Sequence, residues 1–272
     1  TRAKNGGEVL KDSKGNLRYV LLNSAKKLLL DKIPEKTLQQ QIRIMNYGFQ
    51  ELMKLGFTTT HNLGVDKNHM NVYEVRGFKG YYDGSLGSRG AEFLEEYSDK
   101  EGHTGVGGKE YGFHKDMIQK ALDKGFQLAI HAIGDKANRD VLDLYENYFE
   151  TNLESKKLRH RIEHVQVVHP DDFSRFSKLN IIASMEPAHA VEDMPWAIDR
   201  VGNERVLGAY AWRTLRKKNA TVIFNSDFTG SDPSFFYAVY SAITKKKKGE
   251  EKAYFPEQAF TKEESLRAYT IW

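Results

Sequence analysis

The chain has 272 residues, of which 40% are hydrophobic and only 6 are proline. This length can bury a large core and suits one large α/β domain, so disordered and collagen-like classes are excluded. No apolar run approaches the roughly 20 residues that a membrane helix needs, and no signal peptide is recognisable, so we expect no membrane partner. The formal charge of +4 is a small difference between 41 basic and 37 acidic residues, which does not favour a nucleic-acid partner.

Cysteine is absent. Disulfides and thiolate metal ligands are therefore excluded, and a transition metal would have to be held by His, Asp, Glu or a modified Lys. Cytoplasm and periplasm both remain open. The densest basic run, residues 245–248, predicts a solvated loop, with a site for an anionic partner as the alternative. Because the sequence starts at Thr1 without Met and stops inside a helical pattern, we expect it to be a piece of a longer protein.

Residues 1–35 predict a peripheral segment, in which a turn signal at 12–16 precedes an apolar stretch at 19–22. Residues 35–55 carry apolar side chains at helical spacing, and Gly56 stands where a helix cap belongs. Residues 57–60 predict a strand. Further strands are predicted at 72–82, 127–131, 159–166, 181–184 and 221–225, and further helices at 117–124, 135–149, 171–178, 204–217, 235–245 and 261–269.

This alternation of strands and helices indicates βαβ units around a parallel sheet, either open and doubly wound or closed into a barrel. No glycine-rich nucleotide-binding loop follows any of the strands, which favours the barrel. We therefore divide the chain into the peripheral segment 1–35 and an incomplete (β/α)8 barrel at 36–272.

Working residues of parallel-sheet enzymes lie at the carboxyl ends of the strands. Here the predicted strands end at His131, at His164 and near Asp227, and Lys79 lies within the strand at 72–82. Two imidazoles and a carboxylate can converge on one divalent ion, and an enclosed lysine can be carboxylated to become an oxygen ligand. Each residue alone has an ordinary structural explanation. Their joint occurrence at successive strand ends favours a metal site.

His160 and His164 have the i, i+4 spacing of a helical metal motif. Their segment is predicted as a strand, however, in which the two residues would lie about 13 Å apart at about 3.3 Å per residue. They cannot share an ion, so we assign His164 as the ligand and His160 as structural.

Longer motifs resemble a known family. They are KGYYDGSLGSRGA (79–91), HAIGDKA (131–137), RIEHVQ (161–166), ASMEPAH (183–189), DMPW (193–196), GAYAWR (208–213) and SD (226–227). In this order they resemble the YtcJ-like branch of the amidohydrolase superfamily, which includes N-substituted formamide deformylases. The resemblance implies a distorted (β/α)8 TIM barrel of the metal-dependent hydrolase type and a small β-sandwich domain, which is largely missing here.

The resemblance also implies one or two divalent ions, with zinc expected first. By residue, it implies metal ligation by His131, His164, Asp227 and a carboxylated Lys79, with Asp227 also the general base. His189, Glu186 and Arg89 are expected on the substrate side; Glu186 stands where glutamine is usual. The His-x-His pair of the family's first strand occurs nowhere among the nine histidines, and we attribute its absence to missing residues.

We therefore expect a metal-dependent hydrolase that cleaves non-peptide C–N bonds of amide-like small molecules. The alternative is a metal-free, amidohydrolase-like protein that binds or senses a small molecule. In either case the expected partner is a small molecule, and a homodimer is one assembly open to the chain.

Overall fold

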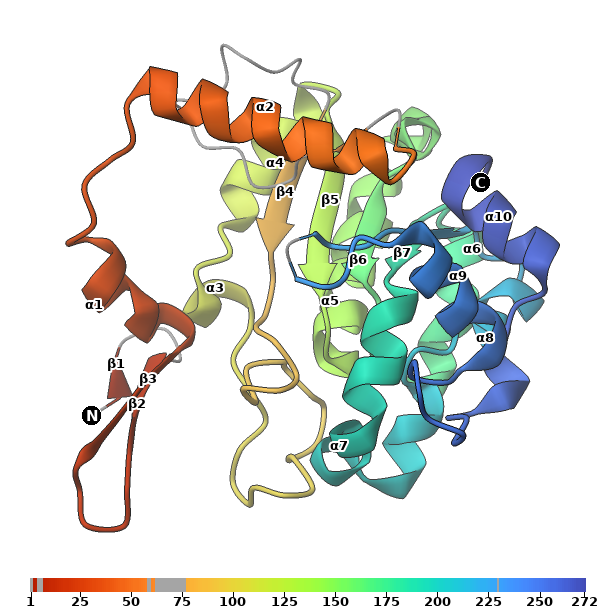
Figure 1. Cartoon of the computed structure of the whole chain (residues 1–272). Helices are drawn as coiled ribbons and strands as arrows, with labels where there is room; N and C mark the ends of the chain where they lie inside the picture. Colours follow the sequence, from red (N-terminus) through yellow and green to blue (C-terminus); the bar gives the residue numbers. More distant parts are fainter. Residues whose placement is uncertain (1, 4–6, 58–59, 62–76, 229) are drawn as a thin grey trace.

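The computed structural model describes residues 2–3, 7–57, 60–61, 77–228 and 230–272. Its centre is a five-stranded parallel sheet, in which every strand pairs with the next strand along the chain (Figure 1). The strands are β4 (Gly77–Tyr81), β5 (Gln127–Ala132), β6 (Arg161–His164), β7 (Ile182–Met185) and β8 (Val222–Phe224). The strand order never reverses, as expected for successive units of a β/α barrel. Closure of a barrel is not seen among the described residues.

Helices connect the strands. They are α3 (Gly108–Tyr111) and α4 (Lys115–Asp123) before β5, α5 (Asp135–Phe149) before β6, α6 (Phe173–Lys178) before β7, α7 (Pro187–Arg205) and α8 (Trp212–Lys217) before β8, and α9 (Phe235–Thr244) and α10 (Lys262–Thr270) after it. Short 3-10 turns are η1 (Asn23–Lys26), η3 (Leu153–Leu158), η4 (Pro170–Asp172), η5 (Val206–Gly208) and η6 (Pro256–Gln258).

The core lies between the sheet and these helices. Strands β6 and β7 are buried along their whole length, as expected for central strands covered on both faces. Helix α5 is an example of a helix that covers the sheet. Its residues Val141, Leu142 and Tyr145 recur on one face and are completely buried. Full burial of one such side chain stabilises the fold by about 1.5–3 kcal/mol, so this face is enough to hold the helix on the sheet.

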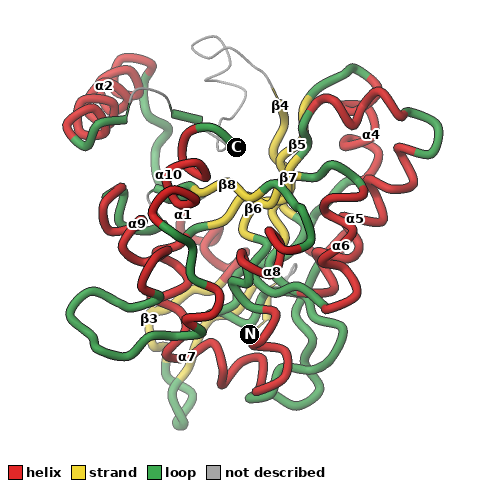
Figure 2. The backbone as a smooth tube through the Cα atoms, turned by 90° about the vertical axis from the view of Figure 1, so that its right-hand side faces the viewer, coloured by secondary structure: helices red, strands yellow, loops and turns green. Residues whose placement is uncertain are grey.

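The N-terminal part lies at the edge of this core and contacts the loop after β4, where the Ser88 hydroxyl donates to the Asn23 side chain over 3.0 Å. Strands β1 (Arg2–Ala3), β2 (Gly7–Lys11) and β3 (Leu17–Leu22) form a small antiparallel sheet, too small for the β-sandwich that the resemblance implies. After the short α1 (Lys27–Leu30), helix α2 (Leu38–Lys54) has no buried residue and lies away from β4 (Figure 2).

Local signals in the sequence explain several element ends. Helix α2 begins with a capping box, in which the Thr37 hydroxyl accepts from the Gln40 backbone and the Gln40 side chain accepts from Thr37. It ends before Gly56, whose φ of +87° is the left-handed conformation that glycine adopts easily. Helix α10 begins with a second capping box, between Thr261 and Glu264. The predicted helices at 35–55, 117–124, 135–149, 235–245 and 261–269 are confirmed with small shifts.

In the second half, one predicted helix is wrong and one helix was missed. The predicted helix at 204–217 does not exist as one element, because Gly208 packs against the Val168 carbonyl, and Val168 donates to the Gly208 carbonyl over 3.1 Å. Helix α7 was not predicted. It merges two helical stretches across Gly202, at φ +77°.

The strand predicted at 72–82 is confirmed at 77–81, while residues 72–76 lie outside the described residues. Of the strand predicted at 57–60, the structure describes Phe57 and Thr60, and neither is in a strand. Among the described residues, the helices include none with the length and apolar composition required to cross a membrane.

Candidate metal centre

The carboxyl ends of the five strands carry the residues that the sequence singles out. In the register of the sheet, His131 at the end of β5 lies opposite Tyr81, and His164 at the end of β6 lies opposite Ala132. Lys79 lies in β4, two residues before Tyr81, and Asp227 follows β8 by three residues. Parallel pairing therefore brings residues that are up to 148 positions apart in the chain to one edge of the sheet.

Two of these side chains, His164 and Asp227, form a tight cluster with His189. Each offers one ligand atom, and these atoms all lie within 4.8 Å of one another. His164 is buried, His189 is partly buried and Asp227 is exposed, so the cluster runs from the protein interior to its surface. His189 comes from the first turn of α7, which the sequence did not predict as a helix. The sequence predicted His189 on the substrate side, and the structure places it beside the expected ligands.

His131 and Lys79 extend the cluster along the sheet. The rings of His131 and His164 have centroids 4.4 Å apart, and the Lys79 Nζ lies 5.1 Å from the centre of the Tyr81 ring. The buried Nε2 of His131 has no hydrogen-bond partner among the described residues; an Asp83 oxygen lies 3.5 Å away. An unpartnered imidazole nitrogen beside two further imidazoles and a carboxylate is the donor set that a divalent transition metal prefers. These residues fit a metal ion.

Asp83 ties the loop after β4 to the loop after β5. Its completely buried carboxylate accepts hydrogen bonds from the backbone N–H groups of Glu92, Ile133 and Gly134. Gly134 is required here because a Cβ would lie 1.9 Å from the carbonyl oxygen of Glu92. The motifs at 79–91 and 131–137 are thus joined by one carboxylate that fixes the backbone just after His131.

Glu186 lies against the cluster and is close to two of its members, His164 and His189. Its Oε2 accepts from the His164 Nδ1 over 3.0 Å and lies 3.6 Å from the His189 Nδ1. Its Oε1 accepts from the Asn225 side-chain amide over 2.8 Å. The sequence predicted Glu186 on the substrate side, whereas in the structure the side chain is buried and bonded to protein groups. Asn225 was not singled out from the sequence, where its position two residues before Asp227 is its only signal.

The electrostatics of the site follow from burial and close charges. Burial lowers the pKa of His131 well below its usual value, and the positive charges of His164 and Lys79 lower it further. Burial also lowers the pKa of Lys79, although three carboxylates, with Glu163 foremost, act in the opposite direction. Both shifts favour the neutral, electron-donating forms. Burial raises the pKa of Asp227, against the lowering effect of His164.

Three residues with strained backbone lie at the same edge. His164, Val165 and Asp227 have φ angles of 75°, 45° and 48°, in the left-handed region that residues with a Cβ avoid. Such conformations each cost on the order of 1–3 kcal/mol and persist where the surrounding structure enforces them, typically at functional sites.

Arg89 does not join the cluster through any contact between described residues. Its guanidinium donates to both oxygens of Asp99, over 3.0 and 2.7 Å. Its assignment to the substrate side stays a prediction. The structural assignment of His160 fits the structure, since its Nδ1 accepts from the Leu128 backbone and its Nε2 lies 2.9 Å from the Ser155 hydroxyl.

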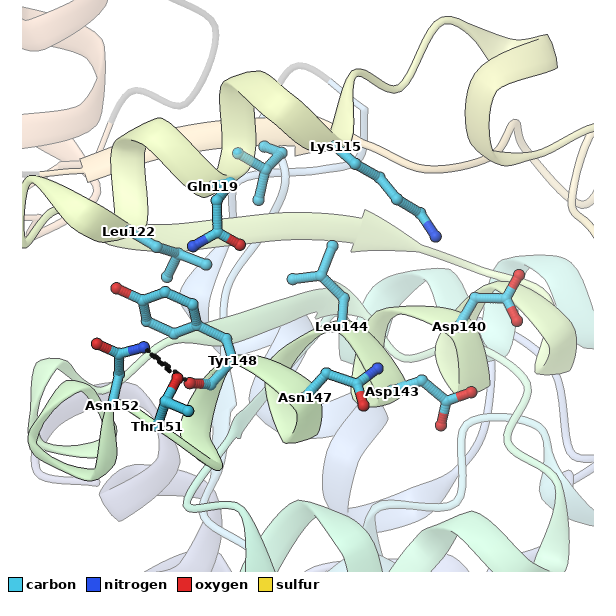
Figure 3. A pocket seen from close by; sticks show the side chains of 11 residues that line it. Lys115, Gln119, Leu122, Asp140, Asp143, Leu144, Asn147, Tyr148, Thr151 and Asn152 are labelled. Atoms are coloured by element: carbon cyan, nitrogen blue, oxygen red, sulfur yellow. Dashed lines mark hydrogen bonds between the residues drawn. The ribbon is translucent and has the colours of Figure 1, made fainter.

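Two surface cavities differ in their relation to the cluster. One, of about 540 Å³, is lined by Lys79 and Tyr81 and by aromatic side chains that include Tyr111 and Phe113. The other, of about 560 Å³, lies between α4 and α5 on the outside of the sheet, with Lys115 and Asp140 at one end (Figure 3). The second cavity contains none of the predicted site residues.

Fold and site together define an α/β protein with a candidate metal centre at the carboxyl edge of its parallel sheet. Residues 1–272 match the profile described as "Amidohydrolase family". The chain belongs to the amidohydrolase family, which confirms the resemblance seen in the motifs.

Individual relatives agree with this assignment. The chain is 26% identical over 309 residues to "Putative amidohydrolase YtcJ" of Bacillus subtilis, covering 97% of this chain and 58% of that protein. It is 34% identical over 196 residues to "Protein LONG AFTER FAR-RED 3" of Arabidopsis thaliana, covering 72% of this chain and 33% of that protein. The chain therefore spans between a third and three fifths of these relatives.

Two solved structures share the fold, and both are described as uncharacterized metal-dependent hydrolases. The one from Pyrococcus furiosus has a TM-score of 0.71 at 24% identity and covers 90% of this chain and 57% of its own. The one from Pyrococcus horikoshii has a TM-score of 0.64 at 27% identity and covers 90% and 52%. The first similarity, below 25% identity, bears on the fold alone.

Proposed function

We propose that this protein is part of a metal-dependent hydrolase that cleaves C–N bonds of amide-like small molecules. The observation that carries the proposal is the convergence of His164, His189 and Asp227 within 4.8 Å, with His131 beside them. Family membership and the similarity to the Pyrococcus horikoshii structure support the reaction class. The amide-like substrate rests on the YtcJ-like motifs.

The position of each residue indicates its role in the proposed reaction. His131, His164, His189 and Asp227 would hold one or two divalent ions, of which zinc fits imidazole and carboxylate ligands well. Such an ion would lower the pKa of a water molecule toward 7 and polarise a substrate carbonyl. Lys79 would add an oxygen ligand if carboxylated, and its lowered pKa favours the neutral amine that reacts with carbon dioxide.

Asp227 is suited to proton transfer because it is the cluster member that reaches the surface. A carboxylate at this position can take a proton from the attacking water and return it to the departing amine. Asp227 is exposed as a residue, but desolvation of its carboxyl group by the surrounding protein raises its pKa and makes it a stronger base than an ordinary aspartate.

The test is metal content, measured by plasma mass spectrometry on the protein and on the variants His131→Ala and His164→Ala. His114→Ala, at an exposed histidine, is the matched control. We expect one to two equivalents of a transition metal, reduced in both site variants but not in the control, together with hydrolysis of simple amides and formamides. Protein that stays metal-free after reconstitution would instead favour a small-molecule binding role.

A further inference from the structure

We propose that Glu186 is a positioning residue that orients His164 directly and Asp227 through Asn225, rather than a substrate contact. This inference rests on the proposed function in assuming that the cluster holds a metal ion. It concerns a group of this chain that touches the presumed ligands without being one.

The first step is the direct hydrogen bond to His164. A carboxylate only accepts hydrogen bonds, so the His164 Nδ1, 3.0 Å from the Glu186 Oε2, must carry the proton. The lone pair of the neutral ring is then on Nε2, the nitrogen that remains for a metal. A carboxylate behind a metal-binding imidazole fixes the ring orientation and makes the nitrogen more basic.

The second step reaches Asp227 through Asn225. The Asn225 Oδ1 accepts from the Asp227 backbone N–H over 2.8 Å, which leaves its amide nitrogen to donate to the Glu186 Oε1 and lie 3.0 Å from the Ser184 hydroxyl. Donor and acceptor are unambiguous in this series of hydrogen bonds, because the Asp227 backbone N–H can only donate and the Glu186 carboxylate can only accept. Glu186 thereby holds the Asn225 amide in the orientation that supports the left-handed backbone of Asp227, with φ 48°.

The third step explains why a charged side chain is tolerated in the interior. Glu186 is 4% exposed and occupies the N-cap of α7, where the unpaired N–H groups of a helix favour negative charge. The rings of His164 and His189 lie on its Oε2 side, with their Nδ1 atoms at 3.0 and 3.6 Å. Among the described residues, the hydrogen bonds and ion pairs of this carboxylate run to His164, His189 and Asn225, so its burial has a positioning explanation.

The network also explains why glutamate and glutamine are not equivalent here. His164 and Asn225 donate to different oxygens of Glu186, and a glutamine has an acceptor oxygen at only one of these two positions and an NH2 donor at the other, so it cannot accept from both. Glu186→Gln must either lose the bond to His164 or force the Asn225 amide to rotate away from the Asp227 N–H. The substitution is almost isosteric, and its effect therefore reports hydrogen-bond direction rather than packing.

The experiment measures binding of cobalt(II) alone by calorimetry and by its visible spectrum. The variants are Glu186→Gln and Glu186→Ala, with Glu192→Gln on the same helix as the matched control. We expect affinity to fall about 10- to 100-fold in both site variants, with a changed spectrum, and to stay unchanged in the control. Circular dichroism checks folding, and if the alanine variant unfolds, the glutamine variant decides. Affinity and spectrum equal to the wild type in a folded Glu186→Gln protein would overturn the proposal.

A second measurement separates this proposal from the proposed function. Nitrogen-15 NMR of metal-free protein, at a pH where the imidazole is neutral, reports which ring nitrogen of His164 keeps its proton. We expect Nδ1 in the wild type and Nε2 in Glu186→Ala, as in a free histidine side chain. If the wild type binds no cobalt, the proposed function fails, while the His164 tautomer still decides the role of Glu186: a proton on Nε2 in the wild type contradicts it.

Discussion

Glu186 and Lys245 are both buried ionisable side chains, but their surroundings differ completely. The Glu186 carboxylate has hydrogen-bond donors at both oxygens, supplied by His164 and Asn225. The Lys245 Nζ lies 3.7 Å from the centre of the Trp212 ring and has no hydrogen-bond partner among the described residues. Glu186 therefore keeps its charge with the help of its partners.

For Lys245, burial disfavours the charged form. Burial lowers its pKa to about 7, with the charge of Glu257 acting weakly in the opposite direction. The contact with the Trp212 ring offsets only part of the cost of burying an ammonium group. The comparison teaches that a buried ionisable group with hydrogen-bond partners marks a functional site, whereas a buried ionisable group without such partners lowers the stability of the fold. Four predictions test or sharpen this difference.

The largest effect is expected where the network of Glu186 ends, at Asp227. Asp227→Asn should reduce amide hydrolysis by about 1000-fold or more, because the amide cannot act as a base in proton transfer. Circular dichroism should show an intact fold, since the side chain is exposed. Asp232→Asn, an exposed aspartate in the same loop, is the control. Activity close to the wild type would exclude the general-base role.

On the other side of the comparison, Lys245→Met should stabilise the protein. At pH 7 the lysine contributes a penalty that corresponds to the shift of its pKa from 10.5 to about 7. At about 1.4 kcal/mol per pKa unit, the gain on removing it is on the order of 2–5 kcal/mol. Urea unfolding measures the gain, with the exposed Lys248→Met as the control. Unchanged or reduced stability of Lys245→Met would refute the idea of an uncompensated amine.

The same lysine predicts a pH dependence with a definite sign. Between about pH 7 and 10.5 the unfolded chain binds a proton at Lys245 that the folded protein does not bind. The contribution of Lys245 to stability therefore rises with pH across this window and is constant below it. Unfolding free energies of wild type and Lys245→Met, measured from pH 7 to 9.5, should converge as the pH rises. A constant difference between them would contradict the prediction.

The smallest effect concerns an ion pair of α10 with α8. Both nitrogens of the Arg213 fork donate to Glu264, at 2.5 and 2.7 Å, and the pair is partly exposed. Glu264→Gln should lower the free energy of unfolding by about 1 kcal/mol, the upper range for a surface pair of good geometry. Glu263→Gln, next to it but highly exposed, should change it less. Equal effects in both variants would show that geometry contributes nothing here.

The sequence by itself determined the alternation of strands and helices, because apolar periodicity and glycine or threonine caps act within a few residues. Helix α5 was predicted with its exact bounds, and the carboxyl-end positions of His131 and His164 followed from where their strands stop. The family followed from motifs in order, and the profile match confirms it.

Only the tertiary structure decided which groups each polar side chain contacts. The run at 245–248 predicts a solvated loop, yet Lys245 is fully buried because α9 ends against Trp212. Helix α7 and the break at Gly208 depend on contacts with distant loops, such as the one between Gly208 and Val168. The cluster of His164, His189 and Asp227 joins three separate strand ends. Periodicity predicts which face of a helix or strand is apolar. Which side chains are buried, and which converge on one site, depends on packing between elements that are far apart in the chain.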